Sequence, residues 1–213
     1  MRPTQTMGLA LRDFYANSWR LVAVNAALGA VLVLSVLAAL AEPLAAVVVV
    51  AAGPVVAALV HCAVTLTRTQ NLTLADAWEG VRFHWRRGLW LGAVCAAFTA
   101  LALVGIHFYG SSALWPLSIV TIYLLVLAGI YALVLWTLAI ADADRGVRSA
   151  AREAAVLVAS RPGATLVLGL ALLLVNVVGI AAAVMPFLTL TVAYTFLAVA
   201  HFVLPPPSPE ESH

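Results

Sequence analysis

Charged residues divide the chain into long apolar stretches. Residues 21–67 contain Glu42 as their only charged residue, and residues 88–141 and 162–209 contain none. An α-helix rises 1.5 Å per residue, so about 20 apolar residues cross a bilayer core of about 30 Å. Each stretch is therefore long enough for two crossings, and the pattern predicts an all-α polytopic membrane bundle of six transmembrane helices.

Turn signals within each stretch set the boundaries of the crossings. Glu42-Pro43 interrupts the first stretch, Gly110-Ser111-Ser112 the second and Met185-Pro186 the third. Proline disfavours helix in the residue before it, so it marks such turns well. The crossings are predicted at residues 21–41, 44–66, 88–106, 115–141, 163–184 and 187–204, within one membrane domain of residues 1–204, and the Pro-rich residues 205–213 are expected to form a disordered cytoplasmic tail.

Composition supports a membrane protein, and the basic residues orient it. Hydrophobic residues make up 64% of the chain and charged residues 9%, against roughly 45–50% and 25% in globular proteins. A soluble domain or a nucleic-acid-binding module is therefore excluded. All eleven basic residues are arginines, and alternate crossings place them on one side. By the positive-inside rule, both termini are expected in the cytoplasm.

Residues 73–87 are predicted to form a helix at the cytoplasmic boundary. Thr73 and Asp76 have the spacing of a capping box, and an apolar stripe follows from Leu74 through Trp78 and Trp85. The stripe fits a helix lying in the headgroup layer, or one packed on the cytoplasmic end of the bundle. In the first case arginines meet anionic lipid headgroups, and the candidate interfacial residues are Trp78, Arg82, Trp85, Arg86 and Arg87.

A weak internal repeat accompanies this helix. Residues 145–161 resemble residues 73–87 weakly, since Glu153 and Arg161 stand eight positions apart, as Glu79 and Arg87 do. Trp19-Arg20 also resembles Trp85-Arg86. This favours a unit of one interfacial helix and one membrane hairpin, used three times.

Polar residues within the crossings are few. No crossing holds Asp, Glu, Lys or Arg in its interior, which argues against a proton relay or an ion-coupled pump. Asn25, His61 and His201 lie just inside the cytoplasmic ends of three crossings and are candidates for a shared polar cavity. The alternative is separate interhelical hydrogen bonds of about 0.6 kcal/mol each. Deeper polar residues would meet across the last hairpin, namely Asn176, Thr189, Thr191 and Thr195.

The sequence contains none of the catalytic motifs that we considered. The chain contains no H-E-x-x-H, G-x-S-x-G or Walker sequence. Asp142 and Asp144 are interpreted as a helix cap or a solvated pair rather than a divalent-cation site. We therefore expect a protein without catalytic residues, cofactor or metal. Small residues, among them Gly29, Gly92 and Gly169, would allow close helix approach within or between chains.

Two segments resemble the YesL family of bacterial membrane proteins (domain of unknown function 624). Residues 53–59, Gly-Pro-Val-Val-Ala-Ala-Leu, resemble its Gly-Pro-x-x-Ala-Ala-Leu segment, and residues 76–87 resemble its aromatic and basic stretch, which enters the third helix. Asn25 stands where that family commonly has an Asn. Since its members are often encoded beside polysaccharide-degrading enzymes and sugar importers, the resemblance implies an accessory role in carbohydrate uptake at the bacterial cytoplasmic (inner) membrane.

Two functional hypotheses follow. The first is a non-enzymatic accessory protein that contacts a sugar permease or a second copy of itself. The second is a small-molecule transporter or channel with a weakly polar site at Asn25, His61 and His201.

Overall fold

The computed structural model describes residues 3–41, 49–142, 144–182 and 190–204. Regular structure in these residues is entirely helical, at 92% helix, so the predicted all-α class is confirmed. The helices are α1 Pro3–Ala16, α2 Ser18–Ala41, α3 Ala52–Thr69, α4 Leu74–Gly110, α5 Trp115–Ala141, α6 Val147–Ser160, α7 Pro162–Ala182 and α9 Val192–Val203.

Five of these helices are long and apolar enough to cross a membrane: α2, α3, α4, α5 and α7. The predicted crossing 115–141 coincides with α5, and the crossings 21–41 and 163–184 match α2 and α7 closely. Some parts of these predictions lie outside the described residues: residues 44–48 of the second crossing, residues 183–184 of the fifth, and the tail at 205–213. The sixth crossing, 187–204, contains α9, which is apolar but only 12 residues long, and residues 187–189 are not among those described.

Helix α4 begins at the predicted capping box. The Asp76 amide donates to Thr73 Oγ1 at 3.3 Å, and the Thr73 amide donates to Asp76 Oδ2 at 2.6 Å. From there the helix runs unbroken for 37 residues to Gly110. The segment 73–87 and the third predicted crossing are thus one helix, because no proline interrupts the sequence between them.

Glycines bring α3 and α4 into the most extensive helix–helix contact of the described chain. A Cβ atom at Gly88 would lie 2.7 Å from the Gly53 carbonyl oxygen, and one at Gly92 would lie 3.0 Å from the Gly53 Cα. Gly80 faces Ala58 in the same way, at 2.9 Å. Backbone meets backbone along this contact, which only residues without a side chain permit. The close approach predicted at Gly92 is confirmed within the chain.

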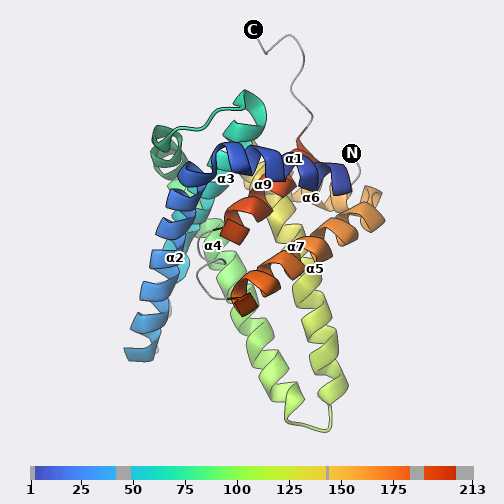
Figure 1. Ribbon diagram of the computed structural model, residues 1–213. Coiled ribbons are helices and arrows are strands. Elements are labelled where there is room, and N and C mark those ends of the chain that lie inside the picture. Colours follow the sequence, from blue (N-terminus) through green and yellow to red (C-terminus); the bar gives the residue numbers. More distant parts are fainter. Residues whose placement is uncertain (1–2, 42–48, 143, 183–189, 205–213) are drawn as a thin grey trace.

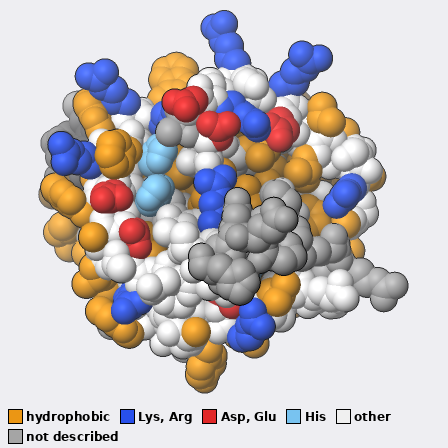
Figure 2. Space-filling model, turned by 90° about the horizontal axis from the view of Figure 1, so that it is seen from above, with side chains coloured by type: hydrophobic (Ala, Val, Ile, Leu, Met, Phe, Trp, Pro, Cys, Tyr) orange, Lys and Arg blue, Asp and Glu red, His pale blue; other side chains and the backbone are white. Residues whose placement is uncertain are grey.

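The remaining helices surround α3 and α9, whose residues dominate the core. Helix α1 packs on α9 and runs crosswise to α2, while α4 and α5 extend together as a hairpin beyond the other helices (Figure 1). The tip of this hairpin lies at the end opposite α1 and α6. Seen from the α1 end, arginine, acidic and histidine side chains gather on one face (Figure 2).

Candidate functional site

Two groups of polar contacts and two cavities in the described part of the chain lie around α9. Nε2 of His201 lies 3.0 Å from Oδ2 of Asp13, which α1 presents to α9, and both side chains are buried. The hydroxyl of Tyr194, two turns earlier, donates to the Met7 carbonyl at 3.2 Å. Arg12 Nε also lies 3.3 Å from Asp13 Oδ1. Because burying a carboxylate is costly unless it is paired, these two contacts offset the cost of burying Asp13.

A second polar cluster joins α7 to the start of α9. Asn176 Nδ2 donates to Thr195 Oγ1 and to the Leu172 carbonyl, both at 2.8 Å, and its Oδ1 accepts from Thr191 Oγ1 at 3.1 Å. The Thr195 hydroxyl in turn donates to the Thr191 carbonyl at 2.8 Å. The predicted meeting of these residues across the last hairpin is confirmed for Asn176, Thr191 and Thr195; Thr189 lies outside the described residues.

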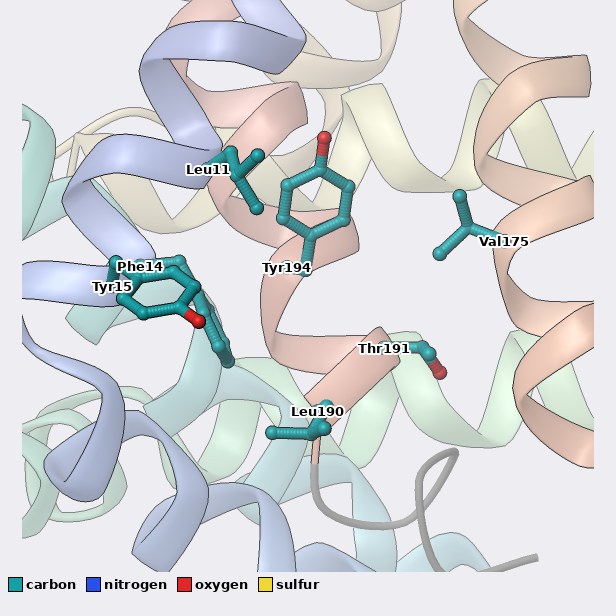
Figure 3. Close-up of a pocket in the computed structure, with 7 residues that line it drawn as sticks. All are labelled: Leu11, Phe14, Tyr15, Val175, Leu190, Thr191 and Tyr194. Atoms are coloured by element: carbon teal, nitrogen blue, oxygen red, sulfur yellow. The ribbon is translucent and has the colours of Figure 1, made fainter. Parts of the chain in front are cut away.

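Two apolar cavities flank this cluster. The first, of about 420 Å³, lies between α1, α7 and α9 and is shown in Figure 3, with Val175 of α7 facing Tyr194 of α9. The second, which we call the central cavity, has a volume of about 550 Å³ and is lined by residues of α2, α3, α5, α7 and α9. It is partly open to the surroundings of the protein.

His61 has its own partner on α4. Its ring centroid lies 5.4 Å from that of His84, with the planes tilted by 44°. Gly80 makes room for it, since a Cβ atom there would lie 3.0 Å from the His61 Cβ. His84 is buried in the contact between α3 and α4.

The structure gives the three candidate cavity residues different surroundings. His61 contacts His84, His201 contacts Asp13, and Asn25 is fully buried in α2. A polar cavity shared by all three stays a prediction. The polar contacts that the structure does bring together are the Asp13–His201 pair and the Asn176 cluster.

Arginines at the charged end hold helix termini as well as facing outward. Arg87 donates from Nη1 to the carbonyls of Ala139 at 2.7 Å and Asp142 at 2.9 Å, and from Nη2 to that of Arg145 at 2.7 Å. Arg68 Nη2 donates to the Ala141 carbonyl at 3.0 Å. The carbonyls of Ala139, Ala141 and Asp142 belong to the C-terminal end of α5 and its cap, where the helix dipole favours positive charge.

The other candidate interfacial residues face outward. Trp78 is 69% exposed and Trp85 is 44% exposed, and Arg82 and Arg86 are exposed as well. The Arg86 guanidinium lies 5.1 Å from the Trp85 ring centroid, and Arg20 lies 5.3 Å from that of Trp19. The predicted likeness of these two Trp-Arg pairs therefore extends to their geometry. The choice between the two interpretations of the 73–87 stripe, a helix in the headgroup layer or one packed on the bundle, stays a prediction.

The acidic pair at the end of α5 makes a local turn. Asp142 Oδ1 accepts from the amides of Asp144 at 3.1 Å and Arg145 at 3.3 Å, and its Oδ2 lies 3.5 Å from Arg145 Nε. This matches the interpretation of Asp142 as a cap. Within the described part of the chain, no group of three or more His, Cys, Asp or Glu side chains is arranged to hold a metal ion.

Sequence reasoning missed two functional-site candidates, Asp13 and His84. Asp13 stands in a polar N-terminal segment that shows no crossing, and His84 stands among arginines. The sequence did hold one signal for Asp13. Thr6, Ala10 and Asp13 follow a helical spacing, and the structure buries all three on one face of α1.

Comparison of the chain with known protein families, with characterised protein sequences and with solved structures finds no match.

Proposed function

We propose that this chain is a non-enzymatic, multi-pass protein of the bacterial cytoplasmic membrane, with both termini in the cytoplasm. It acts as an accessory component of carbohydrate uptake through lateral contact with a sugar permease. The five long apolar helices support membrane insertion, and the gathering of charged side chains at one end supports the orientation. The link to carbohydrate rests on the resemblance of residues 53–59 and 76–87 to the YesL family.

The observation that carries a partner-binding role is the distal half of the α4–α5 hairpin. It extends beyond the other helices (Figure 1), and both of its helices are exposed there. The exposed large side chains include Phe98, Leu101, Val104, Phe108, Ile119, Val120 and Tyr123. Ala97 and Ala100 are exposed beside them. Small residues next to large ones suit close packing of another membrane helix.

Photocrosslinking in native membranes tests this proposal. A photoreactive amino acid at position 101 or 120 is expected to give adducts with a permease subunit, identified by mass spectrometry. The same label at Val156, exposed on α6 away from the hairpin, serves as the matched control. Adducts with a second copy of the chain would mean that the hairpin binds another copy of this protein and not a permease. Adducts with lipid alone at both hairpin positions would overturn the partner-binding role.

The second candidate, a small-molecule transporter or channel, is favoured by the two cavities beside α9. Uptake by proteoliposomes would be measured for the purified protein and for the Asn176→Ala and Thr191→Ala variants, because Asn176 lines the central cavity and Thr191 lines the cavity in Figure 3. Transport that both variants reduce, with thermal stability retained, would favour this candidate over the accessory role.

A further inference from the structure

The central cavity lies among helices that are candidate membrane spans. Four of its five walls, α2, α3, α5 and α7, have the length and hydropathy to cross a bilayer. Its volume of about 550 Å³ falls within the range of about 300–1,000 Å³ that is typical of ligand sites. In the proposed membrane setting, the surroundings of these walls are lipid chains.

The lining offers little to a polar ligand. Apolar side chains such as Leu28, Val56 and Phe196 make up nearly all of the wall. The polar lining residues are Asn176 and Thr195, and their donors already bond to protein oxygens. Water is held by cavities that supply two or more polar partners, whereas apolar cavities bind apolar molecules. The chemistry therefore selects a hydrocarbon.

The cavity opens between α5 and α7. Gly129 of α5 and Leu173 of α7 both line it and are both exposed. A Cβ atom at Gly129 would meet nothing within 4 Å, whereas one at Gly169 would overlap the Ile130 side chain. Gly169 is thus needed for helix packing, while Gly129 leaves space at the opening.

We propose that the central cavity binds one acyl chain of a bilayer phospholipid, which enters from the membrane between α5 and α7 past Gly129. The position of the opening on the side of two candidate spans, rather than at a helix end, favours a molecule already in the bilayer. This inference goes beyond the accessory role and does not depend on the identity of any partner.

Crosslinking from inside the bilayer tests this. The purified protein is reconstituted into vesicles of phosphatidylethanolamine and phosphatidylglycerol that contain a phosphatidylcholine with a diazirine on one acyl chain. Labelled residues are then mapped by mass spectrometry. Leu172 is 1% exposed and Phe196 is 6% exposed, so labelling at either requires a chain inside the cavity. Leu101 and Ile119, exposed on the hairpin, report bulk lipid and serve as an internal reference.

A filled-cavity variant provides the contrast. The Gly129→Phe side chain would occupy space otherwise available to at least two methylenes, so labelling at Leu172 and Phe196 is expected to fall about tenfold relative to the hairpin. Gly163→Phe is the matched control, because a Cβ atom there also meets nothing within 4 Å and the residue does not line the cavity. If Gly129→Phe lowers the thermal stability in detergent, Gly129→Val replaces it.

Three results would overturn the proposal. One is labelling of the hairpin without labelling of Leu172 or Phe196 in the unaltered protein. Another is labelling of these residues that neither Gly129 variant reduces. The third is labelling of Leu172 by a small apolar diazirine but not by the phospholipid, which would identify a small hydrocarbon ligand instead.

Discussion

Nε2 of His201 lies 3.0 Å from Oδ2 of Asp13, across 188 positions of sequence. This contact joins α1 to α9, the first and the last helix that the structure describes. Both side chains are buried, and Tyr194 adds a second link from α9 to the α1 backbone. Polar contacts made by α9 therefore add to the apolar packing of Ala10 and Phe14 in fixing α1 across the charged end.

Replacing Asp13 is expected to loosen α1. The Asp13→Ala variant leaves His201 buried without its carboxylate partner, which should lower the free energy of unfolding by about 2 kcal/mol. Thermal unfolding in detergent measures the loss, and hydrogen exchange should rise over residues 3–16. Arg12→Ala is the comparison, because it removes the other ionic partner of Asp13 but leaves the His201 contact in place. The Arg12 side chain is 69% exposed, and exposed ion pairs contribute less than about 1 kcal/mol. Equal stability of the Asp13 and Arg12 variants would contradict the expectation.

Adding one methyl group between α3 and α4 is expected to be destabilising. In Gly88→Ala the new Cβ would lie 2.7 Å from the Gly53 carbonyl oxygen, so the two backbones must separate. Overpacking of this kind costs about 1–3 kcal/mol. Unfolding in detergent, followed by circular dichroism, would show the loss.

Gly105→Ala is the matched control on the same helix. Its Cβ would have ordinary neighbours, Thr121 at 3.7 Å and Tyr109 at 3.8 Å, and alanine favours helix over glycine by roughly 1 kcal/mol. We expect this variant to be as stable as the unaltered protein or slightly more so. If Gly88→Ala is as stable as Gly105→Ala, the backbones of α3 and α4 do not approach as closely as described.

Local rules predicted much of the fold. Apolar runs and turn residues placed α5 at residues 115–141, and a capping-box spacing placed the start of α4 at Thr73. The Asn176–Thr195 contact was also accessible, because the two residues stand 19 positions apart on neighbouring helices of one predicted hairpin. In each case the determining interactions are close in sequence.

The contacts that escaped prediction depend on how distant helices rotate about their own axes. Asp13 has no sequence signal that connects it with His201, and His84 is read as part of a basic surface until α3 is placed against it. Arg87 likewise looks like a lipid-facing residue beside Arg86. The path of α5 decides that its guanidinium meets the end of that helix instead.

Arg87 and Arg86 are therefore expected to behave differently when each is changed to Gln. Arg87→Gln removes charged donors from carbonyls at the end of α5, and we expect a loss of about 2 kcal/mol in the free energy of unfolding. Amide exchange should also rise over residues 144–150. Arg86→Gln removes only an exposed contact with Trp85, so stability should change by less than about 1 kcal/mol. Similar losses in both variants would count against the capping role of Arg87.

Trp78 and Trp85 test which surface the start of α4 faces. Both rings are exposed, so changing the two together to Ser should alter unfolding in detergent by no more than about 0.5 kcal/mol. If they anchor α4 at the lipid interface, hydrogen exchange over residues 74–87 should increase in lipid nanodiscs but not in detergent.

Trp136→Ser is the control for lost packing, because Trp136 is buried in α5. This variant should unfold at a lower temperature in both detergent and nanodiscs. Exchange that is unchanged in nanodiscs for the Trp78/Trp85 variant would remove the lipid-interface role. A large loss of stability in detergent would mean instead that these rings pack against the bundle, as the second sequence interpretation has it. The two media thus separate a membrane anchor from a protein contact, which the exposure of the rings alone does not distinguish.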